Sequence, residues 1–325
     1  MIRNGKLKNL LNFLIFLLLI NFLYCQKDVN KPEWGLTPVY PQVDAWPAWS
    51  PDGKWIIYMH YGIAAVHRGG RASVNLDSAG FWIMDPNGKH KKMVLKGWNL
   101  GTPAWSPDGK WIAFVNFSDK QIYKAPFVND SIIAREIQQL TYEGWNTFPA
   151  WSPDGEWIAY SRPFSDSSGL SGIWIMKEDG SKKHRIIDGG YPDWSPDGDK
   201  IALVGWFDND ETIGGIIIYN LNVGKKNLLK NGENNFYNSP KYSPGGFMIV
   251  FELNQNIWII NTDGSNQKQL TFDGAVQPSW SPDGSKIVYV KYNYKIYDPP
   301  NNGTIWVMNA DGSNPRQLTH GPNRE

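Results

Sequence analysis

The stretch Trp49-Ser50-Pro51-Asp52-Gly53 decides the fold, because the same five residue types return four more times along the chain. A sixth copy is altered to Tyr-Ser-Pro-Gly-Gly. The copies are separated by 56, 46, 43, 48 and 38 residues, and they begin at Trp49, Trp105, Trp151, Trp194, Tyr242 and Trp280. A period near 46 residues over six copies is typical of a repeat architecture.

The residues around each copy also repeat. A strand-like run such as Trp111–Val115 follows the turn, and a second run such as Ile173–Met176 comes later in the unit. An Asp-Gly or Asn-Gly pair then predicts a hairpin, and a short run such as Gln139-Leu140-Thr141 closes the unit. Four short strands per unit, rich in aromatic and β-branched residues, are typical of a propeller blade. We therefore predict an all-β fold, a six-bladed β-propeller of four-stranded antiparallel blades.

The chemistry of the repeated turn supports this prediction. Proline presets φ for a type I turn, serine and aspartate can bond nearby backbone groups, and glycine accepts the positive φ that closes a hairpin. In the sixth copy Gly245 replaces the aspartate, so we expect that hairpin to keep its backbone path and to lose a side-chain bond.

In spacing and composition the repeats resemble the TolB-like family of β-propellers, also called PD40 or WD40-like repeats, over about residues 44–325. The resemblance implies a rigid disc used as a binding platform, commonly for another protein, in a bacterial envelope. TolB itself carries an α/β domain before its propeller, whereas only a short segment separates Cys25 from the first repeat in this chain. We therefore do not expect this chain to have the full role of TolB.

The N-terminal segment has the layout of a secretory signal. Basic residues between Arg3 and Lys8 precede an apolar run from Leu10 to Leu23, which is short for a membrane-spanning helix. Cys25 at the end of this run resembles the lipid-attachment site of bacterial lipoproteins, although Tyr24 stands where a small residue is usual. The alternative is an ordinary signal peptide, or a short membrane anchor, with an incidental cysteine.

These features predict an exported protein. We expect residues 1–24 to be a signal peptide, residues 25–43 a linker after the lipidated Cys25, and residues 44–325 the propeller. The expected location is the periplasm, or the outer membrane and cell surface, as a lipoprotein. Only the lipid anchor is then expected to touch a membrane.

Charge and cysteine content exclude several classes of function. The 325 residues include 32 Lys or Arg and 31 Asp or Glu, which leaves no basic surplus for binding nucleic acid. A single cysteine excludes an intramolecular disulfide framework and a cysteine-rich zinc site. We expect a monomer whose partner is an envelope protein or peptide, with no nucleic acid.

The 17 tryptophans divide into two groups. Twelve recur at equivalent positions of the repeat, and we expect them to pack between blades, where each ring buries roughly 150–250 Å². The twelve are Trp49, Trp55, Trp82, Trp105, Trp111, Trp151, Trp157, Trp174, Trp194, Trp258, Trp280 and Trp306.

The remaining aromatic candidates fall on connections that we expect to share one face, around the mouth of the central channel. In a four-stranded blade the second-to-third loop and the link to the next blade lie on that face. The candidates for binding are Trp46, Trp98, Trp145, Tyr191, Trp206 and Phe207. Exposed aromatic residues in a shallow pocket are typical of sites for peptides or sugars. The alternative is that these rings plug the channel mouth or pack against neighbouring loops.

The largest insertion is in the first repeat, between Met59 and Phe81, and is expected on the same face. It contains His60, His67 and Arg68, so it could clamp an acidic ligand over the aromatic mouth. It could equally be a solvated insertion without a binding role.

A loop in the fourth repeat carries three carboxylates, those of Asp208, Asp210 and Glu211. A calcium loop needs glycine at its sixth place, and Ile213 stands there. We therefore interpret this segment as a solvated acidic loop, with a cation site as the weaker alternative.

No recognised catalytic motif is found in the sequence. It contains no G-x-S-x-G elbow and no H-E-x-x-H, and its five histidines are dispersed. Some polysaccharide lyases use related propellers with a metal held by several histidines, whereas this chain offers at most His60 and His67 near the channel. We therefore expect a non-enzymatic binding scaffold with no cofactor. The competing hypothesis is an enzyme or binding protein that acts on glycans or small acidic ligands at the mouth.

Overall fold

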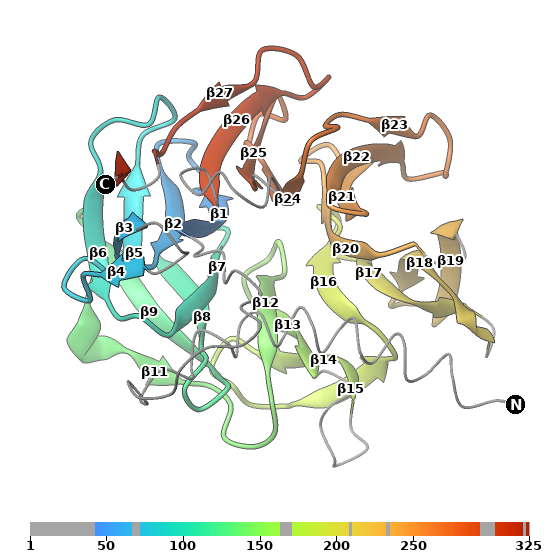
Figure 1. Ribbon diagram of the computed structural model, residues 1–325. Helices are drawn as coiled ribbons and strands as arrows, with labels where there is room; N and C mark the ends of the chain where they lie inside the picture. Colours follow the sequence, from blue (N-terminus) through green and yellow to red (C-terminus); the bar gives the residue numbers. More distant parts are fainter. Residues whose placement is uncertain are drawn as a thin grey trace, which may run out of the picture.

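Six β-sheets stand in a ring, one for each repeat, in the computed structural model (Figure 1). The structure describes residues 43–66, 72–162, 171–207, 210–231, 235–292, 303–320 and 323–324. Within each sheet the strands pair antiparallel in chain order, as the third blade shows in full. The prediction of a six-bladed propeller with four-stranded antiparallel blades is confirmed.

The strands of blades one to three follow the repeat. Blade one contains β1 (Asp44–Trp49), β2 (Ile56–His60), β5 (Gly80–Met84) and β6 (Lys92–Lys96). Blade two contains β7 (Leu100–Trp105), β8 (Trp111–Asn116), β9 (Gln121–Val128) and β11 (Gln138–Gln139), with β10 (Ser131–Ile132) and the 3-10 helix η1 (Ala134–Glu136) inserted between the last two. Blade three contains β12 (Thr147–Trp151), β13 (Trp157–Arg162), β14 (Gly172–Lys177) and β15 (His184–Ile187).

Blades four to six repeat the same order. Blade four contains β16 (Gly190–Trp194), β17 (Lys200–Phe207), β18 (Asp210–Asn220) and β19 (Lys225–Asn231). Blade five contains β20 (Tyr237–Tyr242), β21 (Met248–Leu253), β22 (Asn256–Asn261) and β23 (Lys268–Gln269). Blade six contains β24 (Ala275–Trp280), β25 (Lys286–Lys291), β26 (Thr304–Asn309) and β27 (Arg316–Gln317), so all its described strands come from the C-terminal part of the chain.

Antiparallel order divides the connections between two faces of the ring. The first strand of each blade lies innermost, and the chain reverses direction at every strand. The first-to-second and third-to-fourth turns therefore lie on one face, which we call the turn face. The second-to-third loops and the links between blades lie on the opposite face, which we call the mouth face.

The repeated turns join neighbouring blades. In blade two the Ser106 hydroxyl donates to the Asp108 carboxylate at 2.6 Å and accepts the Trp111 N–H at 2.9 Å. Gly109 has a φ of +70° and packs against Pro51 of the preceding blade. The same glycine–proline contact recurs at all six junctions, including the one between the last blade and the first. The altered turn of blade five keeps the serine-centred backbone path, as expected.

Tryptophan indoles form a second contact between blades. Nε1 of Trp105 donates to the Ala48 carbonyl of blade one at 3.3 Å. Trp151, Trp194 and Trp280 make the same bond to the blade before them, at 3.2, 3.1 and 3.1 Å. For these four the expected packing between blades is confirmed.

Two junctions depart from this pattern. Between blades four and five, Asp193 accepts hydrogen bonds at 2.9 Å from the Tyr242 N–H and from Lys241 Nζ, so a carboxylate replaces the indole bond. Between blades six and one, the buried Nε1 of Trp49 has no hydrogen-bond partner among the described residues. We call this last junction the seam.

Each innermost strand contains a bulge near the mouth face. One residue before a proline adopts a positive φ between 47° and 58°, and the register to the second strand shifts at that point. These six residues, which we call the inner ring, are Trp46, Thr102, Phe148, Tyr191, Ser239 and Gln277. A left-handed residue in one strand produces such a bulge and changes the direction of its side chain.

The insertion in blade one is more ordered than the expected loop. Ile63–Val66 (β3) and Ala72–Val74 (β4) form a hairpin, and Asn323–Arg324 (β28) pairs parallel to β3. The hairpin connection at residues 67–71 lies outside the described residues. Blade four differs as well, because Trp206 and Phe207 continue β17 and do not begin a loop.

Candidate functional site: the mouth face

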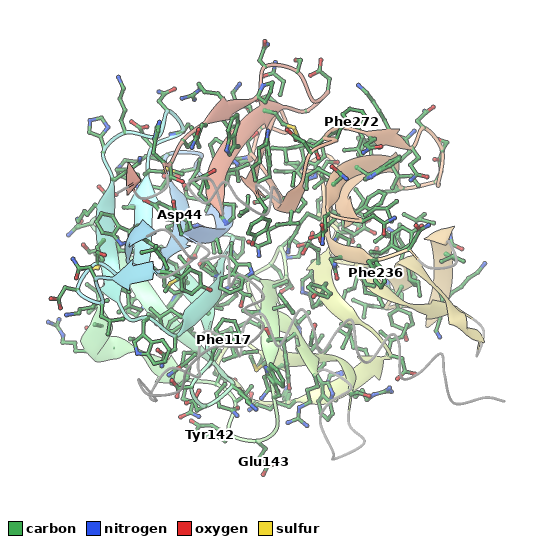
Figure 2. The ribbon with its side chains drawn as sticks, in the orientation of Figure 1. Asp44, Phe117, Tyr142, Glu143, Phe236 and Phe272 are labelled. Carbon is green, nitrogen blue, oxygen red and sulfur yellow. The ribbon has the colours of Figure 1, made fainter. Side chains whose placement is uncertain are left out.

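Four large aromatic side chains are exposed on the links between blades. Trp98 is 42% exposed, Tyr142 70%, Phe236 45% and Phe272 77%. They stand on the links from blade one to two, two to three, four to five and five to six, so all four belong to the mouth face. Figure 2 shows Tyr142, Phe236 and Phe272 on different blades around the ring. We call these four residues the mouth aromatics.

The expected aromatic ring is only partly correct. Trp98 is exposed, and Trp145 is half-buried beneath Lys120, whose Nζ lies 4.7 Å from the ring centre. Trp46 and Tyr191 are buried, so the expectation of exposed rings is wrong for both. The side chains of Trp206 and Phe207 lie outside the described part of the structure.

The inner-ring bulge explains why Trp46 and Tyr191 are buried. The Trp46 ring packs against Phe117 of blade two, with the ring centres 5.5 Å apart. The Tyr191 ring lies 4.1 Å from that of Phe148 in the preceding blade. Because the positive φ directs these rings against neighbouring blades, they belong to the wall and contribute little exposed surface at the mouth.

Of the charged candidates, only His60 has a side chain among those the structure describes. His60 Nδ1 lies 2.7 Å from the buried carboxylate of Asp44, and the His60 ring rests edge-on against Trp82. His67, Arg68 and Asp208 lie outside the described residues, as do the side chains of Asp210 and Glu211. Figure 2 labels Asp44, which lies on the inner side of blade one.

Several charged residues described on the mouth face form ion pairs. Lys96 Nζ lies 2.6 Å from Asp77, and Lys291 Nζ lies 2.6 Å from Asp273. Arg185 pairs with Asp188 on the link between blades three and four. These ion pairs contribute little to stability, and the mouth aromatics are exposed on the same face.

A polar network supports the mouth between blades two and three. Arg162 is buried, donates to the Asn146 side chain at 3.1 Å and to the Glu143 carbonyl at 2.8 Å, and stacks on Trp174. Asn146 in turn donates to Gln121 at 2.9 Å. This network fixes the backbone of the link that carries Tyr142.

Glu252 is a buried carboxylate on the inner side of blade five. Its side chain is 4% exposed, and the Asn238 amide donates to it at 3.3 Å. Burial raises the pKa of Glu252 from 4.5 to about 7, while Asn238 and the backbone amide of Gln277 act in the opposite direction. Burial, together with the nearby Glu252 charge, also raises the pKa of the Tyr191 phenol. Perturbed groups of this kind gather at functional sites.

Two clefts of about 450 and 600 Å³ lie on the turn face, not at the mouth. Both are lined by the repeated turns, and they share Pro107 and Asp108. The Asp108 carboxylate is already engaged by the Ser106 hydroxyl and the Lys110 N–H, so it has a structural role. Among the described residues no cluster of three His, Cys, Asp or Glu is placed to hold a metal ion.

Sequence reasoning missed Tyr142, Phe236, Phe272 and Glu252. Tyr142 and Phe272 each follow a Leu-Thr pair that closes a repeat, and this shared position was the available signal. Glu252 stands out as a charged residue within the apolar strand Met248–Leu253. No comparable signal marks Phe236.

A family model described as the TolB beta propeller domain matches residues 42–271 and 191–325 of the chain. A curated relative, an uncharacterized protein of Agrobacterium fabrum, is 32% identical over 88 residues, which span 25% of this chain and 30% of that protein. Among the residues described, no helix is long and apolar enough to cross a membrane.

Solved structures of the same fold come from several bacteria. TolB of Acinetobacter baumannii aligns with a TM-score of 0.62 at 21% identity, over 86% of this chain and 65% of that one. A protein of Agrobacterium tumefaciens assigned as TolB aligns with a TM-score of 0.58 at 24% identity, over 71% and 86%. An oligogalacturonate lyase of Vibrio parahaemolyticus aligns with a TM-score of 0.52 at 13% identity, over 76% and 73%. At these identities the likeness concerns the fold alone.

Proposed function

The chain belongs to the TolB β-propeller domain family, and from this premise we propose that it is a non-enzymatic binding scaffold that docks an envelope protein or peptide on its mouth face. The family supports a binding platform, and the docking partner and the absence of catalysis are our inference. A propeller is a scaffold shared by many functions, so the argument depends on the exposed side chains of this chain.

The mouth aromatics carry the proposal. Four of the five links between blades present a large ring to solvent, and each link is held by a rigid blade on either side. Aromatic rings are enriched at protein interfaces because they bury a large area for few rotatable bonds. Ion pairs such as Lys96 with Asp77 and Lys291 with Asp273 lie on the same face and add polar groups to it. This combination favours a protein or peptide partner over a nucleic acid.

The proposal includes an attachment to the envelope. The basic start, the apolar run and Cys25 precede the described residues and support export with a lipid anchor. In this proposal a lipid on Cys25 holds the propeller at the envelope, where its mouth face meets a partner in the periplasm or at the cell surface.

Alanine variants of the mouth aromatics test the proposal. A chain carrying Trp98→Ala, Tyr142→Ala, Phe236→Ala and Phe272→Ala should lose partner capture from the native envelope by at least about 30-fold, as hot-spot truncation does. Thermal unfolding should change little, because exposed side chains contribute little to stability. Phe247→Ala is the matched control, since Phe247 is 78% exposed on the turn face. Equal capture by both variants would refute docking at the mouth.

A second candidate function rests on the pair of Asp44 and His60. A histidine held by a buried carboxylate is an arrangement suited to proton transfer, so it favours the enzyme hypothesis for glycans or small acidic ligands. Turnover of acidic oligosaccharides by the purified chain, abolished by His60→Ala, would support this function. Turnover unaffected by that substitution would remove His60 as its catalytic residue.

A further inference from the structure

Glu252 is a charged residue at a position where the second strands of the other five blades have uncharged residues. It pairs in register with Asn238 near the mouth end of β20 and β21. The second-strand residues at the same register point of the other blades are Met59, Val115, Ser161, Val204 and Val290. Burial of a carboxylate is costly unless it is paired or protonated. Among the described residues, no ion pair involves Glu252.

Few groups of the described residues face Glu252. Asn238 contributes its side-chain amide from β20, and Gln277 contributes its backbone amide from β24. The Tyr191 phenol faces it from blade four and is affected by its charge. Blade one also places a titratable pair, His60 and Asp44, on the mouth side of the seam.

Gln277 connects Glu252 to the first blade. Its backbone amide interacts with the Glu252 carboxylate in blade five, and its side-chain oxygen accepts the Trp46 N–H of blade one at 2.7 Å. A path of contacts therefore runs from Glu252 through Gln277 to Trp46, across blades five, six and one.

The path ends at one of the two junctions that lack the indole–carbonyl bond among the described residues. The seam lacks the indole–carbonyl bond, because Trp49 Nε1 has no partner in the described part of the chain. At its mouth end it is held by the bond from the Trp46 N–H to Gln277 and by the bond from the Asp44 N–H to the Gly303 carbonyl at 2.7 Å. The hydrogen bond from Trp46 to Gln277 is therefore one of the contacts that join the two blades at this end.

We propose that Glu252 is a proton switch that sets how firmly the first and last blades are joined at the mouth, and thereby regulates docking there. When Glu252 is protonated, the layer is neutral and Gln277 stays fixed against Trp46. When Glu252 is ionised, the buried charge draws Gln277 and water toward itself, and the Trp46 contact loosens. The raised pKa of Glu252, about 7, places the change near neutral pH. The docking step rests on the proposed function, whereas the response of the seam does not.

Amide resonances test the switch without any partner. In wild type, the backbone amide signals of Trp46 and Gln277 should titrate together between about pH 5.5 and pH 8.5, with the midpoint of the Glu252 carboxyl carbon. Glu252→Gln should abolish the titration of Trp46. His60→Gln is the control and should leave it unchanged. The proposal would be overturned if the Trp46 amide still titrated in Glu252→Gln, or if it no longer titrated in His60→Gln.

Two further measurements keep the test decisive. If Glu252→Gln does not fold, the midpoints of the Trp46 amide and the Glu252 carboxyl carbon are compared in wild type. Different midpoints overturn the proposal. A shared midpoint, together with an unchanged Trp46 titration in His60→Gln, supports it. Partner affinity should be about fivefold higher at pH 6 than at pH 8 in wild type and independent of pH in Glu252→Gln. If the Trp46 and Gln277 amides titrate as expected but no partner is captured, the proposed function and the docking step are refuted. The response of the seam to Glu252 is then still supported.

Discussion

Replacing Glu252 by glutamine should stabilise the propeller above neutral pH and leave it nearly unchanged in acid. Glutamine has almost the same shape and still offers an oxygen to Asn238 and to the Gln277 amide, but it carries no charge at any pH. The substitution therefore removes the cost of a buried carboxylate and little else.

The size of the effect follows from the shift in the pKa. Burial raises the pKa of Glu252 from 4.5 to about 7, so the folded chain holds this proton more tightly than the unfolded chain. The associated stability is complete below pH 4.5 and is lost as the pH rises to about 7. At about 1.4 kcal/mol per pKa unit, the loss is about 3.5 kcal/mol. For a domain of this size it corresponds to roughly 6 °C in Tm.

Thermal unfolding followed by circular dichroism measures the difference directly. Wild type and Glu252→Gln are compared at about pH 5 and about pH 8.5, so that other titrating groups cancel within each pair. Glu143→Gln is the control, because Glu143 is exposed on a link of the same face. The Tm of Glu252→Gln should exceed that of wild type by several degrees at the higher pH only.

The reasoning has a clear point of failure. A Glu252→Gln variant that is less stable than wild type at both pH values would show that the ionised carboxylate makes favourable contacts. Equal differences at both pH values would show that the pKa of Glu252 is not raised in the folded chain.

Three other substitutions test the fold and the anchor. Trp105→Ala should cost about 3–5 kcal/mol of unfolding free energy in denaturant melts, because it removes a ring between blades and the bond to Ala48, and a loss under about 1 kcal/mol would contradict this role. Gly155→Ala should lower stability by about 1 kcal/mol, since the residue has a φ of +75° and a Cβ there would lie 3.4 Å from Pro107; an unchanged Tm would contradict strain at this turn. Cys25→Ser should release the protein from membranes into the soluble fraction, and continued membrane association would exclude the lipid anchor.

The fold was predictable because the sequence of the repeat occurs six times along the chain. Each turn is decided locally, by serine and aspartate bonding to the backbone and by a glycine that accepts a positive φ, so one copy such as Ser106–Gly109 predicts the others. The hairpin of β3 and β4 was not predictable in the same way. It occurs once, and its third strand, Asn323–Arg324, comes from the far end of the chain.

The candidate site was predictable only as a face. Strand alternation places the links between blades on the mouth side, and this was sufficient to select Trp98. The exposure of single residues could not be predicted from the sequence. The bulges of the inner ring direct Trp46 and Tyr191 into the wall, and a single sequence does not predict such a bulge. Tyr142 and Phe272 share a repeat position directly after a Leu-Thr pair, and that position is the signal in the sequence that marks them.

Photo-crosslinking from single positions tests the central claim most directly. A benzophenone amino acid is placed at Tyr142, at Phe272 or, as the control on the opposite face, at Phe247, and cells are irradiated before the envelope is solubilised. Docking on the mouth face predicts the same protein adduct from Tyr142 and Phe272 and none from Phe247. An adduct formed from Phe247 alone would contradict the account.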